Sequence, residues 1–200
     1  MPIAKLTLSM VASPLIILFS LSVAGDLADG KQPRRDKEFT LPKSLHGDFS
    51  DYRNQWIRLN NIDYSGLHWQ QFITVYTKHG QVAYKHNHLA YRRWYEDPDD
   101  EDNDIPFKKY PIGTAFVKEN FTSHHSKPGK LSTVTAMIKR RYKGSTNGDS
   151  WEYIQFDTDG NIIVQGGADN TRIARTCANC HASVAERDYI FATTYSASEQ

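Results

Sequence analysis

The sequence predicts an α+β domain made mainly of antiparallel β-sheet and closed by a C-terminal helix that carries a Cys-x-x-Cys-His motif. Two observations predict this fold class. After residue 70, several stretches alternate polar residues with β-branched or aromatic residues, a pattern typical of half-buried strands. Beyond the last of these stretches, capping residues and a helical pattern precede the cysteine motif.

The predicted strands follow one another closely enough to pair as antiparallel neighbours. Residues 157–161 read Asp-Thr-Asp-Gly-Asn and predict a tight turn, because Asp, Asn and Gly tolerate the backbone conformations that such turns need. The last two strands should therefore form a hairpin. We expect strands at Phe72 to Tyr76, Thr114 to Phe121, Leu131 to Lys139, Trp151 to Phe156 and Ile162 to Val164.

Two helices are predicted. The first covers about His86 to Tyr95. The second begins near Thr171, where Asp169 or Asn170 can cap the free N–H groups of the first turn, and it continues through the cysteine motif to Glu186.

An acidic segment, residues 96–104, follows the first predicted helix. It resembles a calcium loop only superficially. Counted from Asp100, the positions where an EF-hand needs Gly and Glu are taken by Ile105 and Pro111. An exposed acidic loop is the preferred interpretation.

The N-terminus has the pattern of a secretory signal peptide. Lys5 precedes an apolar stretch from Leu6 to Leu21, and small residues follow at Ser22-Val23-Ala24. The predicted organisation is a signal peptide at 1–24, a flexible polar leader at 25–50 and a single domain at 51–200, which predicts a periplasmic protein. The alternative is an uncleaved membrane anchor, because the stretch approaches the ~20 apolar residues that span a bilayer.

The charge balance excludes one class of partner. The full chain has a formal net charge of +1 with histidine neutral, and cleavage would remove Lys5. The mature protein then has no surplus of basic residues to attract nucleic acid or an anionic membrane surface. Nucleic acid is therefore not an expected partner.

The two cysteines of the chain both lie in Cys177-Ala178-Asn179-Cys180-His181. One helical turn can direct two thiols at the vinyl groups of a haem, while the next residue presents an imidazole to the iron. A thioredoxin-like dithiol would need a βαβ setting, and a zinc site would need further ligands. We therefore predict one covalently attached haem c per chain, with His181 as the proximal iron ligand.

The sixth iron position has no obvious ligand. Electron-carrier cytochromes usually have a methionine well after the haem motif, whereas the last methionine here, Met137, precedes it in a predicted strand. Met137 could face the haem or fill a gap in the core. His68, just before a strand, is the one histidine that stands out as a further candidate. Surface positions are expected for the others: His46, His79, His86, His88, His124 and His125.

Four short motifs together resemble the cytochrome P-460 family, over about Gln55 to Tyr195. Four stretches of the family have counterparts here: Gly-Thr-x-x-Val-Lys-Glu, an Ala-x-x-Lys strand with a following aromatic strand, Cys-x-x-Cys-His, and an ending of Asp, then Tyr or Met, then any residue and Phe. They correspond to Gly113–Glu119, Ala136–Lys139 with Trp151, Cys177–His181 and Asp188–Phe191.

The resemblance implies roles for further residues. It implies that Lys118 bonds covalently to a haem meso carbon and that the iron is five-coordinate, with an open distal site that oxidises hydroxylamine. The alternative for Lys118 is a lysine that extends to solvent or pairs with a haem propionate. Thr135 stands where the family enzymes carry a distal carboxylate, and Ile73 where they carry an arginine. Loss of both groups would remove a proton acceptor and an anion-orienting group. We group Ile73 and Met137 with Cys177 and Cys180 as residues expected to contact the haem.

Three functions stay open at this point. An enzyme would oxidise hydroxylamine or a similar small nitrogen compound and pass electrons to a soluble redox partner. A protein similar to the related cytochrome c-prime-beta proteins would only bind nitric oxide or carbon monoxide. A six-coordinate electron carrier would use Met137 or His68 as its second axial ligand. A homodimer is compatible with all three.

Overall fold

Seven short or medium strands form one antiparallel sheet, in the order β1-β3-β4-β5-β6-β7, with β2 also pairing with β3. The computed structural model describes residues 39–100, 102, 105–141 and 150–196, all within one compact unit. Every pairing is antiparallel, which confirms the predicted fold class. The strands are β1 Ile57–Arg58, β2 Asp63–Ser65, β3 Gln71–Lys78, β4 Ala115–His124, β5 Lys127–Lys139, β6 Trp151–Asp157 and β7 Ile162–Gly166.

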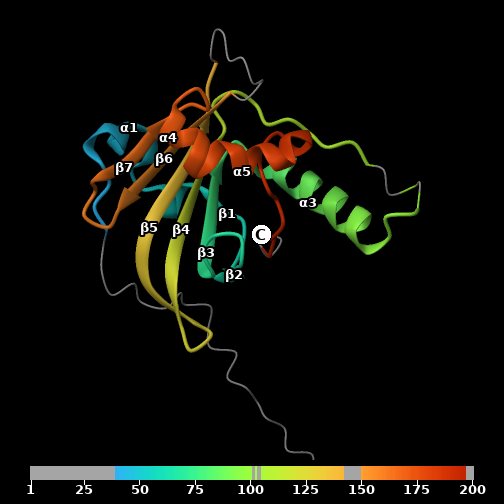
Figure 1. Cartoon of the computed structure of the whole chain (residues 1–200), viewed down its shortest axis with the longest axis horizontal. Helices are drawn as coiled ribbons and strands as arrows, with labels where there is room; N and C mark the ends of the chain where they lie inside the picture. The colour runs from blue at the N-terminus through green and yellow to red at the C-terminus, as the bar shows by residue number, and fades with distance from the viewer. Residues whose placement is uncertain (1–38, 101, 103–104, 142–149, 197–200) are drawn as a thin grey trace, which may run out of the picture. The chain divides into compact units, whose positions relative to one another are not determined.

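Helix α3, Gln81–Glu96, lies between β3 and β4 in the chain and contains the first predicted helix. The second predicted helix is a helical segment that changes its winding along its length. Asn170 caps it, because its side-chain oxygen accepts hydrogen bonds from the backbone N–H groups of Arg172 and Ile173. The segment consists of α4 Thr171–Ile173, the π-helical η3 Ala174–Ala178, α5 Asn179–His181 and the 3₁₀-helical η4 Ala182–Arg187. Figure 1 shows α4 and α5 crossing in front of β4 and β5.

The packed domain begins earlier than predicted. Residues 39–50 were expected to belong to a flexible leader, yet Leu45 and Phe49 are buried and the backbone N–H of Thr40 donates to Thr158. The elements there are very short, so they carry no hydrophobic period that the sequence could reveal. They are η1 Lys43–Leu45, α1 His46–Phe49 and α2 Tyr52–Gln55. The predicted signal peptide and residues 25–38 lie outside the described part of the chain.

Strand alternation gives the sheet two different faces. On the back face, Val117, Val134 and Phe156 are fully buried against the N-terminal elements. The front face carries Phe116 and Tyr153 and packs against α3 and the C-terminal segment. The same alternation separates neighbours in sequence, so residues 118 and 119 face different environments.

A buried carboxylate ties the N-terminal elements to the back face. Glu119 has no exposed surface, and its Oε1 accepts hydrogen bonds from the Tyr52 hydroxyl at 2.5 Å and from Arg53 Nε at 2.7 Å. A buried carboxylate requires such partners, because removing a charge from water without compensation costs several kcal/mol. Strand β4 and helix α2 are therefore held in one arrangement directly behind the front-face position of Lys118.

Replacing Phe49 by alanine tests whether the N-terminal elements belong to the folded domain. Phe49 is fully buried, and its ring centroid lies 5.2 Å from that of Trp56. We expect Phe49→Ala to lower the free energy of unfolding by about 3–5 kcal/mol, as for other buried aromatic residues. Urea denaturation measures it, with Val82→Ala at an exposed position of α3 as a control expected to change little. Equal effects of the two variants would show that residues 39–50 do not contribute to the core.

Candidate functional site

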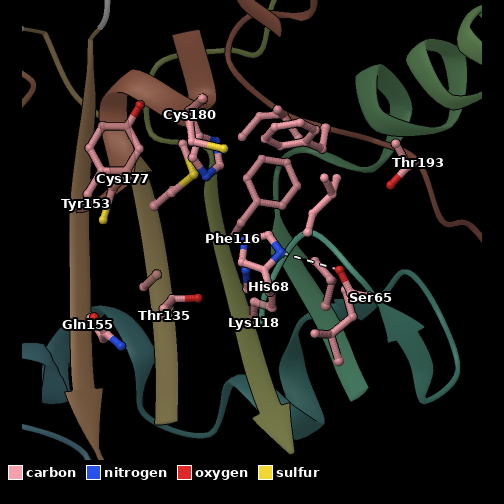
Figure 2. Close-up of a pocket in the computed structure, with 18 of the residues that line it drawn as sticks. Ser65, His68, Phe116, Lys118, Thr135, Tyr153, Gln155, Cys177, Cys180 and Thr193 are labelled. Atoms are coloured by element: carbon pink, nitrogen blue, oxygen red, sulfur yellow. Dashed lines mark hydrogen bonds between the residues drawn. The ribbon is translucent and has the colours of Figure 1, made fainter. Parts of the chain in front are cut away.

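The front face of the sheet and the C-terminal helical segment enclose a cavity of about 450 Å³ (Figure 2). This volume lies within the range of roughly 300–1,000 Å³ that is common for ligand and cofactor sites. The cavity is lined by residues from β3, β4, β5, β6 and the C-terminal segment, which are far apart in sequence. All seven predicted site residues line it: Ile73, Lys118, Thr135, Met137, Cys177, Cys180 and His181.

Strand register brings the polar groups of the cavity side by side. Lys118 of β4 pairs with Thr135 of β5, which in turn pairs with Gln155 of β6. Residues that pair directly across antiparallel strands point to the same face, so all three side chains face the cavity. Figure 2 shows them on three adjacent strands. Gln155 was not predicted, because the sequence shows its strand but not its register.

A hydrogen bond and two aromatic rings hold the His181 imidazole in one orientation. Its Nδ1 lies 2.6 Å from the backbone oxygen of Tyr189, and a carbonyl oxygen can only accept a hydrogen bond. Nδ1 therefore carries the proton, and Nε2 keeps its lone pair. The rings of Tyr153 and Phe191 pack against the imidazole, with centroids at 5.5 and 5.3 Å. A histidine that ligates a metal through one ring nitrogen usually donates a hydrogen bond from the other, as Nδ1 does here.

Burial also keeps this imidazole neutral. Desolvation lowers the pKa of His181 to about 4, the hydrogen bond to Tyr189 opposes the shift, and the nearby Lys118 adds to it. At neutral pH the ring is therefore uncharged. A neutral imidazole with a free Nε2 is the form that binds iron.

Both cysteines are free thiols on the helical segment that precedes His181. Cys177 is half-buried and Cys180 is exposed, and both line the cavity. The π-helical stretch includes Cys177, and such local widening of a helix often occurs at functional sites.

Lys118 extends into the cavity rather than to the outer surface. Desolvation lowers its pKa to about 7, although the two cysteines nearby act in the opposite direction. A large share of the amine is therefore uncharged at neutral pH. An uncharged amine has a free lone pair and is nucleophilic.

The remaining predicted residues give the cavity an apolar character. Ile73 and Met137 are buried, at 6% and 9% exposure, and Met137 packs within the front-face core. Thr135 contributes a hydroxyl beside Lys118. Among the described residues that line the cavity, none is an aspartate or a glutamate. Lys118 and His68 are then nitrogen bases among the described lining residues that can accept a proton.

His68 lies in the cavity wall, as its place before β3 suggested. Its Nδ1 is 3.4 Å from the Ser65 hydroxyl oxygen. Desolvation, Lys118 and His181 lower its pKa to about 3, so the ring is neutral. Three other histidines contact backbone carbonyl oxygens instead: His46 that of Leu41, His86 that of Pro106 and His88 that of Ala192.

Comparison with known families agrees with this geometry. Residues 68–192 match the family described as Cytochrome P460. The chain belongs to the cytochrome P460 family. A search of curated proteins finds no match.

Membership of the cytochrome P460 family makes the chain a c-type haem protein, which contains iron. The residues of the cavity fit such a group, because two free thiols and one oriented, neutral imidazole converge on an apolar space. The individual roles of these residues stay predictions. In the part of the chain that the structure covers, no helix has the length and hydropathy that crossing a membrane requires.

Lys118 generates a prediction about pH. Its pKa is lower in the folded state than in the unfolded state, so between about pH 7 and 10 the unfolded chain binds more protons and stability rises with pH. Lys118→Met removes this dependence. In a haem-free background with Cys177→Ala and Cys180→Ala, the unfolding free energy of the Lys118 protein should rise by up to about 1.4 kcal/mol per pH unit relative to Lys118→Met. Chemical denaturation at pH 7, 8 and 9 measures the difference.

The matched control is Lys109→Met, since Lys109 is an exposed lysine in the loop before β4. It should leave the pH dependence unchanged. If the unfolding free energy of the Lys118 protein and of Lys118→Met changed with pH in the same way, the amine would stay charged in the cavity.

Proposed function

We propose that the chain is a periplasmic mono-haem c-type cytochrome with an open distal iron site that binds small nitrogen compounds such as hydroxylamine or nitric oxide. In this proposal one haem is attached through Cys177 and Cys180, and His181 is the proximal ligand. The single observation that carries it is the hydrogen bond from His181 Nδ1 to Tyr189, which leaves Nε2 free beside both thiols. When bound, the haem would supply an exchangeable ligand position and one-electron redox chemistry.

The distal side favours binding of a small ligand. Ile73, Met137 and Thr135 leave space without offering a charged group, and a small uncharged ligand needs no counter-ion there. Lys118 supplies the one lysine amine among the described lining residues. Its lowered pKa supports the role that the family resemblance assigns to it, the covalent link to the haem edge.

Oxidation of a bound nitrogen compound should be slow in this cavity. Such a reaction releases protons, and a threonine hydroxyl is a far poorer base than a carboxylate near neutral pH. General-base assistance is typically worth ~10²- to 10⁴-fold in rate. The proposal is therefore ligand binding with slow hydroxylamine oxidation, in which electrons pass to a soluble redox partner.

The periplasmic location in this proposal depends on export through a signal peptide at 1–24, which rests on the sequence pattern alone.

A second function has one specific observation in its favour. His68 lines the cavity and is neutral, so its imidazole is chemically able to ligate iron. Ligation would fill the open position and make the protein a six-coordinate electron carrier. The His68 ring currently lies within reach of the Ser65 hydroxyl, at 3.4 Å, a contact that ligation through Nδ1 would remove.

Covalent attachment is tested by mass spectrometry of the denatured mature protein. The intact chain should carry the mass of one haem, because thioether bonds survive denaturation. Cys177→Ala and Cys180→Ala, combined with Lys118→Met so that no lysine link holds the haem, should lose that mass, whereas His181→Ala should retain it and change the spin state of the iron. Bare wild-type chain with two free thiols would refute the proposal.

The distal assignment is tested by adding a carboxylate. Thr135→Glu should raise the rate of hydroxylamine oxidation on the order of 10²-fold, because it supplies a general base beside Lys118. The affinity for hydroxylamine, measured by absorption titration, should change little. Thr135→Gln, similar in size but unable to accept a full proton, is the matched control. Rapid turnover by the wild type that is lost in His68→Phe would instead assign the proton to His68.

A further inference from the structure

A buried ion pair lies outside the cavity, next to Tyr189, the residue whose carbonyl contacts the candidate iron ligand. Lys139, the last residue of β5, places its Nζ in contact with Asp188 Oδ2, and both side chains are about 8% exposed. The Lys139 ammonium also lies 5.5 Å from the centroid of the Trp151 ring. Neither charged residue lines the cavity. The pair joins the end of the sheet to the chain just after the helical segment.

Hydrogen bonds hold Asp188 in place in addition to its ion pair with Lys139. Its Oδ2 also accepts the backbone N–H of Tyr110 at 2.7 Å, and its backbone oxygen accepts the indole N–H of Trp151 at 2.9 Å. Its own N–H donates to Ala185 at 3.0 Å. Backbone and side chain are thus held by the loop before β4, by the sheet and by the helical segment. Such over-determination is needed wherever a backbone adopts a disfavoured conformation.

The backbone at this point is disfavoured. Asp188 and Tyr189 have φ angles of 56° and 66°, in the left-handed region, and neither is glycine. For a bulky residue such as Tyr189 this conformation is sterically unfavourable, so surrounding contacts must maintain it. This turn directs the Tyr189 carbonyl toward His181, and the carbonyl oxygen accepts the hydrogen bond from His181 Nδ1 at 2.6 Å.

We propose that Lys139 and Asp188 are positioning residues for the proximal histidine. They hold the Tyr189 carbonyl against His181 Nδ1 and thereby set the electron donation of Nε2 to iron. The inference rests on the proposed function, in which His181 ligates the haem. A strong hydrogen bond at Nδ1 raises the basicity of the imidazole, and a more basic ligand stabilises ferric over ferrous iron. Loss of the pair should lengthen that bond and raise the reduction potential.

A purely structural ion pair would behave differently. Removing it would lower stability without altering the iron, because the remaining contacts of the turn, with Trp151, Tyr110 and Ala185, would maintain it. The experiment therefore needs a readout at the metal besides a melting temperature. The reduction potential of the haem and the iron–histidine stretching frequency of the ferrous protein report directly on the proximal bond.

The test uses the mature haem protein with Lys139→Met and Asp188→Asn combined. This double variant removes both charges, so no unpaired charge remains buried, and Asn can still accept from Tyr110. We expect a more positive reduction potential and a lower iron–histidine stretching frequency than in the wild type. Lys139→Arg keeps the charge and should retain the wild-type potential. Unchanged potential and stretching frequency in the double variant would overturn the inference.

Two comparisons complete the design. Arg140→Gln with Glu152→Gln removes a more exposed ion pair nearby, between the residue after β5 and Glu152 of β6, 43% and 14% exposed, and should leave the potential unchanged. A shift of equal size there would assign the effect to general charge loss and overturn the inference. If the Lys139→Met and Asp188→Asn protein does not accumulate with haem, Lys139→Leu with Asp188→Asn, which also leaves no unpaired charge, must show the same upward shift, and no shift overturns the inference.

Failure of the proposed function would be recognised separately. If His181→Ala leaves the spectrum of the iron unchanged, His181 is not the ligand, and the proposed proximal role falls with the inference. If His181→Ala changes the spectrum but the double variant keeps the wild-type potential, only the positioning role of Lys139 and Asp188 is wrong.

Discussion

The hydrogen bond between His181 Nδ1 and the Tyr189 carbonyl is the interaction on which the site depends. It decides which nitrogen carries the proton and therefore which one can meet a metal. The Tyr189 carbonyl lies in a left-handed turn at residues 188 and 189, and Asp188 is held there by contacts from three separate parts of the fold. The short Cys-x-x-Cys-His motif thus lies within an extensive framework of buried polar contacts.

Two adjacent residues of β4, Lys118 and Glu119, lie on opposite faces of the sheet in different environments. Glu119 points to the back face, where Tyr52 and Arg53 satisfy its charge. Lys118 points to the front face, where burial favours its neutral form. A paired carboxylate stabilises the attachment of the N-terminal helices, whereas a lysine that has lost its charge becomes chemically reactive. The difference follows from the two-residue period of a strand and from what covers each face.

The sequence by itself determined the local features of the protein. Alternation identified β3 to β7, the Asp-Gly turn identified the last hairpin, and the capping residue Asn170 marked the start of the C-terminal segment. The cysteine spacing indicated haem chemistry, and the short motifs indicated the family that residues 68–192 confirm. These features are readable because each depends on residues within a few positions of one another. Alternation also places Thr135 and Met137 on the same face of β5, because they are two residues apart in one strand, whereas only the strand register places Lys118 beside Thr135.

Only the tertiary structure decided which segments pack against each face of the sheet. Register placed Gln155 beside Thr135, and packing made residues 39–50 part of the core although they show no periodic pattern. The shifts that leave His68 and His181 neutral arise from burial by distant segments. Most of all, the contact between Lys139 and Asp188 joins two of the sequence motifs that had no apparent connection. Such pairings depend on long-range packing, and no local pattern of residues encodes which partner a buried charge will find.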